Sequence, residues 1–165
     1  TAYRRQRQMC IRDRGSAHQG LREYQVPVEY GRSEIIRKGK KIAVLGVGSM
    51  IPSCMEICKG LKDDGYDPTF VNARFVKPLD VDLLDELAKD HSLFVTVEEN
   101  VKSGGYGEHV SAYMEACHPE IRVLSAAVWD RFVPQGNVES LRSRIGLGVE
   151  DIRQAIEDSE ELREQ

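Results

Sequence analysis

Residues 41–65, "KIAVLGVGSMIPSCMEICKGLKDDG", decide the fold of this 165-residue chain. The segment opens on an apolar run, passes through two glycines, and continues with apolar residues at helical spacing. Such a pattern is typical of a strand covered on both faces, followed by a helix that packs on the same sheet. We expect a strand over 42–47 and a helix over 50–62, with Ser49 as the N-cap of that helix.

The two glycines, Gly46 and Gly48, raise the question of a nucleotide-phosphate site. A dinucleotide-binding loop has a third glycine three residues on, where this chain has Ile51. It also needs an acid at the end of the second strand, where this chain has Asn72 and Arg74. The Gly-Lys-Ser/Thr run of a P-loop does not follow either. We therefore interpret the loop as a structural turn.

The alternation of strand and helix continues along the rest of the chain. Further strands are expected over 33–37, 69–73, 93–97 and 122–126. Further helices are expected over 80–91 (with Asp80 as N-cap), 107–117, 138–145 and 149–157. This spacing predicts an α/β domain with a mainly parallel sheet. The expected fold class is three-layer α/β/α with roughly five strands, the strand over 33–37 being antiparallel at an edge.

Composition divides the chain into a leader, a linker, one domain and a tail. Residues 1–16 hold five arginines and one acid, so the remaining residues carry a net charge of −8. We interpret 1–16 as a foreign or disordered basic leader, 17–40 as linker and edge strand, 41–158 as the domain, and 159–165 as an acidic tail. An acidic body argues against a nucleic-acid partner. No apolar run approaches the ~20 residues of a membrane span.

The cysteines and histidines form no recognisable reactive site. The four cysteines are scattered and make neither a disulfide framework nor a zinc motif. Cys54 and Cys58 lie one helical turn apart on the apolar stripe of the helix over 50–62, so we interpret them as core residues. Cys117 precedes His118 at an expected helix end, which we interpret as structural, and no Gly-x-Ser-x-Gly elbow is present. This cysteine usage indicates a reducing cytoplasm.

Two segments carry more chemistry than a plain loop requires. In "VTVEENVKSGGYGEHV" (95–110), two acids and an amide follow the carboxyl end of a strand, and a glycine-rich turn leads into a helix. In "WDRFVPQG" (129–136), a tryptophan and a phenylalanine lie in a loop too apolar for free exposure. Open α/β sheets bind ligands and partners at this edge. The alternative for 95–110 is a loop of solvated acids. The expected interface residues are Glu98, Glu99, Asn100, Gly104, Gly105, Tyr106, Trp129, Asp130, Arg131 and Phe132.

Four motifs occur in the order and with the spacing of a known family. They are "VEYGRSEII" (28–36), "ARFVKPLD" (73–80), "VTVEEN…GGYG" (95–107) and "DRFVPQG" (130–136). Through them, residues from about 21 to 158 resemble the C-terminal domain of the transketolase-like, thiamine-diphosphate-dependent enzymes. More narrowly, the chain resembles the last domain of the 1-deoxy-D-xylulose-5-phosphate synthases. The β subunits of 2-oxo acid dehydrogenases share the fold, and "DRFVPQG" favours the synthases.

The resemblance implies a parent transferase that joins pyruvate to glyceraldehyde 3-phosphate with loss of CO₂. That enzyme uses thiamine diphosphate and Mg²⁺ and supplies isoprenoid, thiamine and pyridoxal synthesis. This domain is then expected to support a homodimer and to pack on the upstream catalytic domains. The family's Gly-Asp-Gly…Asn cofactor motif is not found in this sequence. The nearest string is Asp63-Asp64-Gly65, and no Asn follows it at the required distance. The chain alone is therefore expected to bind no cofactor and to be inactive.

The leader is where the resemblance ends. In the family, Arg-Tyr-Pro-Arg-Gly precedes this domain and places an arginine near the substrate phosphate. Here "IRDRG" (11–15) lacks the Tyr-Pro, so the resemblance assigns that role only to Arg14. Two alternatives stay open. One is a free-standing interaction module that pairs with a separate catalytic chain, and the other is the C-terminal part of a 2-oxo acid dehydrogenase β subunit or of a transketolase.

Overall fold

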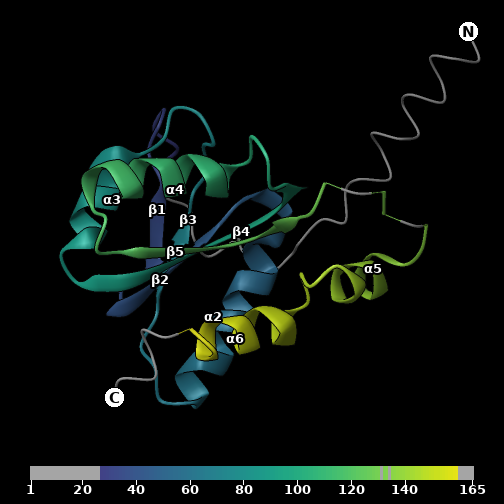
Figure 1. Cartoon of the computed structure of the whole chain (residues 1–165). Helices are drawn as coiled ribbons and strands as arrows, with labels where there is room; N and C mark the ends of the chain where they lie inside the picture. The colour runs from purple at the N-terminus through teal and green to yellow at the C-terminus, as the bar shows by residue number, and fades with distance from the viewer. Residues whose placement is uncertain (1–26, 131, 134, 160–165) are drawn as a thin grey trace, which may run out of the picture.

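The computed structural model describes residues 27–130, 132–133 and 135–159. Within them, helices cover both faces of a five-stranded sheet (Figure 1). The strands are β1 (Glu34–Arg37), β2 (Lys41–Gly46), β3 (Thr69–Asn72), β4 (His91–Val101) and β5 (Arg122–Val128). The helices are the 3-10 turn η2 (Gly48–Met50), α2 (Ile51–Asp63), α3 (Val81–Ala88), α4 (Tyr106–Cys117), α5 (Val138–Arg144) and α6 (Val149–Glu157).

The order of the strands in the sheet is β1-β3-β2-β4-β5. Strands β2 to β5 run parallel, and in their register Val44 of β2 lies between Phe70 of β3 and Val95 of β4. Strand β1 pairs with β3 in the antiparallel direction, with Glu34 opposite Asn72. The expected three-layer, mostly parallel fold is confirmed, together with its antiparallel edge strand.

Two hydrophobic cores lie on the two faces of the sheet. Side chains alternate along β2, so that Ile42 and Val44 pack with residues of α2 and α6, while Ala43 and Leu45 pack with residues of α3 and α4. All four are essentially inaccessible. This double burial explains why the strand reads as a continuous apolar run rather than an alternating one.

The two cysteines of α2 belong to the core, as expected from their spacing. Cys54 is 0% exposed and Cys58 is 3% exposed. Burial raises the pKa of both thiols, that of Cys58 to about 12, so the thiolate that a metal needs is disfavoured. Within the described ranges, no group of three or more His, Cys, Asp or Glu residues could hold a metal ion. Nor does any helix there have the length and apolar character to cross a membrane.

Two local expectations were wrong. Ser49 does not cap α2, because the helix follows η2 directly and has Met50 at its N-cap without a side-chain bond. His91 does not end α3, which stops at Ala88, but begins β4. Its buried ring lies 2.8 Å from the Leu87 carbonyl oxygen and 2.7 Å from the hydroxyl of Thr69. The histidine therefore ties the end of the helix to the sheet.

Candidate functional site

The four sequence motifs meet at one edge of the sheet. We call this the carboxyl edge, and it consists of residues 28–34, 73–82, 98–108, 128–130, 132–133 and 135–142. Parallel strands place all their carboxyl ends on one side, and the antiparallel β1 begins on that same side. Open α/β sheets bind ligands and partners along this edge. The parallel topology therefore brings together motifs that lie far apart in the sequence.

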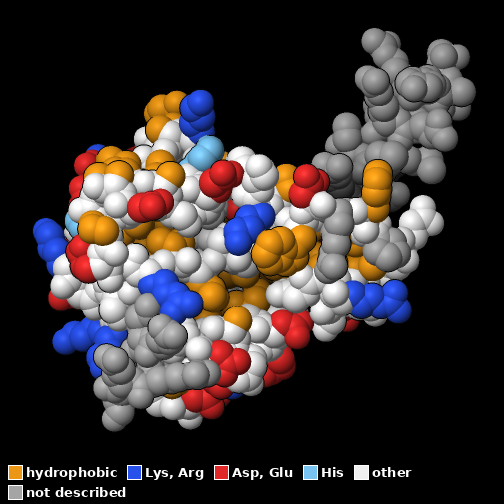
Figure 2. All heavy atoms as spheres, in the orientation of Figure 1, with side chains coloured by type: hydrophobic (Ala, Val, Ile, Leu, Met, Phe, Trp, Pro, Cys, Tyr) orange, Lys and Arg blue, Asp and Glu red, His pale blue; other side chains and the backbone are white. Residues whose placement is uncertain are grey.

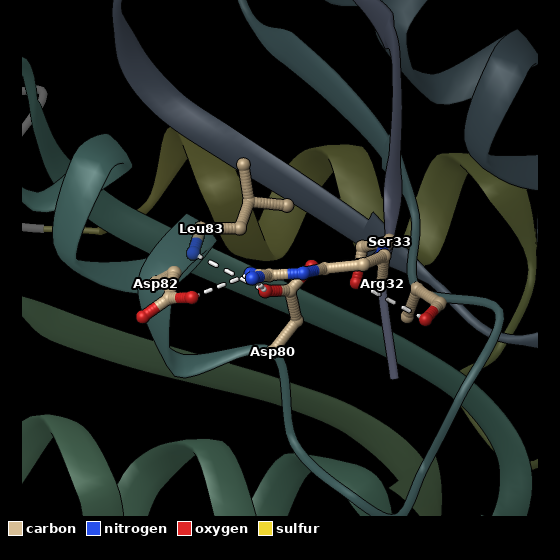
Figure 3. A network of polar contacts seen from close by, with 6 residues as sticks. Arg32, Ser33, Asp80, Asp82 and Leu83 are labelled. Atoms are coloured by element: carbon tan, nitrogen blue, oxygen red, sulfur yellow. Dashed lines mark hydrogen bonds and ion pairs between the residues drawn. The ribbon is translucent and has the colours of Figure 1, made fainter. Parts of the chain in front are cut away.

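Asp80 joins the first two motifs (Figure 3). Its carboxylate accepts hydrogen bonds from the Ser33 amide at 2.6 Å and from the Arg32 guanidinium at 3.1 Å. It also accepts one from the Leu83 amide at 3.4 Å, which confirms the predicted N-cap of α3. Arg32 donates a further bond to Asp82 at 2.6 Å. Since Asp80 is only 8% exposed, these donors replace the water that its carboxylate loses on folding.

Arg74 makes a second link between the same motifs, and sequence reasoning did not select it. One guanidinium nitrogen donates to Glu34 at 2.6 Å, and the two side chains are 12% and 8% exposed. Another nitrogen donates to the Pro27 carbonyl at 3.1 Å. The backbone φ of Arg74 is +52°, a conformation that is uncommon outside glycine. Arginines often follow strands, so the sequence position of Arg74 alone could not have indicated its bonds to Glu34 and Pro27.

Glu98 belongs to the expected interface residues, and the structure places it inside the domain. It is 2% exposed, and its carboxylate accepts hydrogen bonds from the amides of Tyr106 at 2.9 Å and Gly107 at 2.8 Å. These amides open α4 and have no partner within the helix. A carboxylate at this end also interacts favourably with the positive end of the helix dipole. Glu98 therefore supplies the cap that Gly105, the N-cap residue, lacks.

The glycine turn is shaped by this buried carboxylate. A Cβ on Gly105 would lie 2.6 Å from Glu98 Oε1, so only glycine fits. Gly105 and Tyr106 are buried with Glu98, whereas Asn100 and Gly104 are exposed. The buried residues fix the loop from within the domain, and the exposed ones lie at its surface.

Glu99 points away from this cap and ties the carboxyl edge to α5. Its carboxylate accepts hydrogen bonds from Arg142 Nε at 3.2 Å, from Arg142 Nη2 at 3.1 Å and from the Ser49 hydroxyl at 2.6 Å. Partial burial by itself raises the pKa of Glu99, but the bonds from Arg142 and Ser49 together with the arginine charge lower it overall. None of the residues of α5, all of them described, is buried. The ion pair therefore attaches to the domain a helix that has no buried side chain.

We expect Arg142→Ala to lower the free energy of unfolding at neutral pH by less than about 1 kcal/mol, because solvent screens a pair this exposed. The folded-state pKa of Glu99 is below its unfolded value, so its stabilising contribution is present at neutral pH and is lost as the pH falls through the folded-state pKa. Urea denaturation at neutral pH and at about pH 3.5 measures the difference between variant and wild type, which should shrink on acidification. Arg144→Ala, at an exposed position of the same helix, is the control. A difference that grows on acidification contradicts this assignment.

Exposed apolar residues gather beyond the end of β5. Trp129 is 57% exposed, Val138 is 55% exposed and Phe132 is fully exposed. The ammonium of Lys102 lies 4.8 Å from the centre of the Trp129 ring. Figure 2 shows hydrophobic side chains gathered on this face, with charged residues among them. Beside the tryptophan is a pocket of about 380 Å³, lined by Lys102, Ser103, Glu108, Ser111, Ser125, Trp129 and Asp130.

We call Trp129, Phe132 and Val138, three large apolar side chains exposed on the segment that follows β5, the aromatic surface. It contains two of the four residues expected at the interface from the motif "WDRFVPQG". A third, Asp130, is exposed beside them. Arg131 and Arg14 lie outside the described residues, so their predicted roles have no structural counterpart here.

The string Asp63-Asp64-Gly65, the nearest match to the family's cofactor motif, does not fit a diphosphate–magnesium site. Asp63 ends α2 and Asp64 is its C-cap, where the helix dipole is negative and repels a diphosphate. The Asp64 carboxylate is already occupied, since it accepts a hydrogen bond from Arg153 at 2.6 Å. The string Asp63-Asp64-Gly65 is therefore a helix end and not a cofactor motif.

Fold and site together define an open α/β domain, covered by helices on both faces, whose polar and aromatic residues concentrate at the carboxyl edge. The chain belongs to the transketolase C-terminal domain family, whose sequence profile, described as "Transketolase, C-terminal domain", matches residues 31–152.

Among curated relatives, the 1-deoxy-D-xylulose-5-phosphate synthase of Lachnoclostridium phytofermentans is 38% identical over 140 residues, which are 84% of this chain and 22% of the relative. That of Dictyoglomus thermophilum is 39% identical over 137 residues, which are 83% of this chain and 22% of the relative. This chain thus spans about a fifth of their length. A solved structure described as "Split gene transketolase, inactive beta4 tetramer" matches with a TM-score of 0.76 and 28% identity, covering 84% of this chain and 44% of that one. The resemblance read from the four motifs is confirmed.

Proposed function

We propose that this chain is the C-terminal part of a 1-deoxy-D-xylulose-5-phosphate synthase. The observation that carries the proposal is the 38% identity to a curated synthase over 84% of the chain. The parent enzyme condenses pyruvate with glyceraldehyde 3-phosphate, releases CO₂, and supplies isoprenoid, thiamine and pyridoxal synthesis. Bound thiamine diphosphate supplies the electron sink for the carbanion left by decarboxylation. The free thiols of Cys54, Cys58 and Cys117 agree with a reducing cytoplasm.

The residues of this chain contribute binding surface and not chemistry in this proposal. Thiamine diphosphate and Mg²⁺ are held by other parts of the parent enzyme, since Asp63 and Asp64 do not fit them. Asp80 and Glu98 fix the loops of the carboxyl edge from within. The exposed residues of that edge, Trp129 and Phe132 among them, pack against the upstream catalytic domains or the second subunit of a homodimer. The chain alone is then inactive.

A domain exchange tests the synthase assignment. Residues 27–159 of this chain replace the corresponding C-terminal domain of the Lachnoclostridium phytofermentans synthase, and formation of deoxyxylulose phosphate is measured. We expect product above that of the same enzyme with the domain deleted, and none from this chain by itself. A chimera that folds and is no more active than the deletion contradicts the proposal. Product from the chain alone would contradict the division of labour.

We expect Trp129→Ala to leave the melting temperature of the chain nearly unchanged, because the side chain is 57% exposed and makes few internal contacts to lose. Its binding to the upstream domains, added as a separate polypeptide, should weaken by about 30-fold, which is typical of a central aromatic anchor. Calorimetric titration measures the affinity. Met55→Ala, a 39% exposed position on α2, is the matched control and should bind as wild type. Equal affinities for the two variants would remove Trp129 from the interface.

A second candidate is a free-standing module that pairs with a separately encoded catalytic chain. It is supported by the structural relative described as a split-gene transketolase. Sequencing the genomic DNA upstream of codon 16 separates the two candidates. A reading frame that continues for several hundred codons and contains the Gly-Asp-Gly…Asn motif supports the synthase. A start codon with a ribosome-binding site near Ser16 supports the module.

A further inference from the structure

Strand β5 forms one edge of the sheet and pairs only with β4 among the described strands. Its sequence, "RVLSAAV", contains no proline and no charge after Arg122. Its register with β4 is regular from Arg122 to Ala126. In Figure 1, β5 runs along the near side of the molecule, between α4 above and α6 below. A long, regular and apolar edge of this kind is a template for a further strand.

At the opposite edge of the sheet, strand β1 has three features that prevent pairing with a further strand. Strand β1 has four residues, and its register is interrupted between Ile35 and Arg37. Arg37 forms an ion pair with Asp67, and Lys38 follows it directly. Short length, a bulge and positive charge all protect an edge. Strand β5 has seven residues and lacks the bulge over most of its length. It is therefore the edge that the fold leaves available.

We propose that β5 pairs in the antiparallel direction with β5 of a second copy of this chain, about a twofold axis at Ser125. In this register Leu124 of one copy lies opposite Ala126 of the other, and Val123 lies opposite Ala127. On each face of the joined sheet, a large side chain meets a small one, which suits close packing between neighbouring strands. A twofold contact uses one patch twice, so the patch has to be complementary to itself. The sequence around Ser125 meets that condition.

The charges around the strand agree with the same occupant. Arg122 is exposed at the start of β5, while Asp130 and Glu108 are exposed near its end. Antiparallel pairing carries the arginine of each copy toward the two acids of the other, so the potentials are complementary. The pairing also brings the aromatic surface at Trp129 close to the second copy. This inference rests on the homodimer of the proposed function, to which it adds the strand that makes the contact.

Sedimentation of the full-length chain tests the pairing. We expect wild type to form a dimer and Ala126→Lys to raise the dimer dissociation constant at least about tenfold, because an inward charge blocks an edge strand. Ala116→Lys, at an exposed position of α4, is the matched control and should dimerise as wild type. Circular dichroism verifies that each variant is folded. A monomeric wild type, or a folded Ala126→Lys variant with wild-type affinity, overturns the proposal.

Disulfide trapping tests the register and remains decisive where Ala126→Lys does not fold. In a chain with Cys10 and Cys117 changed to serine, Ser125→Cys places one thiol opposite its own copy, within the ~4.4–6.8 Å between Cα atoms that a disulfide spans. Oxidation should give a covalent dimer of Ser125→Cys and none of Ser111→Cys, the control on α4. No covalent dimer from a chain that sediments as a dimer overturns the pairing. If the exchanged synthase is active in that case, the proposed function stands without it.

Discussion

Replacing Glu98 by alanine should lower the free energy of unfolding by about 3 to 5 kcal/mol, because two buried amides lose their acceptor and each unpaired donor costs about 1 to 3 kcal/mol. The amides are those of Tyr106 and Gly107, at 2.9 and 2.8 Å from the carboxylate. Glu98 is 2% exposed, so these amides do not face bulk solvent. A loss of this size is a large part of the stability of a domain.

Glu99→Ala is the matched control for this substitution. It removes the neighbouring carboxylate, which is 39% exposed and pairs with Arg142, and should cost less than about 1 kcal/mol. Glu98→Gln keeps one acceptor oxygen and should fall between the two. Urea denaturation followed by far-ultraviolet circular dichroism gives all three values. Equal losses for Glu98→Ala and Glu99→Ala would show that the cap does not carry the stability assigned to it.

We expect Asp80→Ala to cost about 2 to 4 kcal/mol, since it removes both the cap of α3 and the acceptor of a partly buried amide. The carboxylate accepts from Ser33 at 2.6 Å and from Leu83 at 3.4 Å, so its loss loosens the start of α3 and the approach to β1 together. Hydrogen exchange should accordingly speed up at the amides of Ser33 and Leu83. Denaturation in urea measures the global loss.

Asp82→Ala distinguishes the hydrogen bonds from the Ser33 and Leu83 amides to Asp80 from the ion pair of Asp80 with Arg32. Both aspartates contact that arginine, but Asp82 is 70% exposed and bonds to it at 2.6 Å. Its removal should cost less than about 1 kcal/mol and leave the exchange of the Ser33 amide unchanged. If Asp82→Ala were as costly as Asp80→Ala, the arginine contact and not the amide bonds would be the source of the stability.

The helices and strands were predictable because their signals are local. Apolar spacing placed α6 at its observed residues and gave β3 and β5 to within two residues. The boundary of α3 was wrong by three residues at its C-terminus, because His91 reads as part of an amphipathic helix until its contacts with Thr69 and Leu87 are known. Such contacts join residues distant in sequence and leave no periodic trace.

The sequence predicted where the candidate site lies in the sheet, but not how its side chains are oriented. The motifs indicated the carboxyl edge, and parallel strands can only bring them together there. The opposite directions of Glu98 and Glu99 could not be predicted while the strand was expected to end at Val97. Strand β4 continues to Val101, so successive side chains in it point to opposite sides. One acid is therefore buried as a cap, and the next one reaches Arg142.

By itself, the sequence determined the fold class and the family, and it predicted the edge of the sheet at which the candidate site lies. It could do so because these depend on residue periodicity and on the order of four motifs. The tertiary structure decided which residues of that edge are internal supports and which are free surface. It also set the left-handed backbone of Arg74, the bond from Ser49 to Glu99, and the contrast between the two edge strands. These features depend on distances between segments that only the packed sheet brings together.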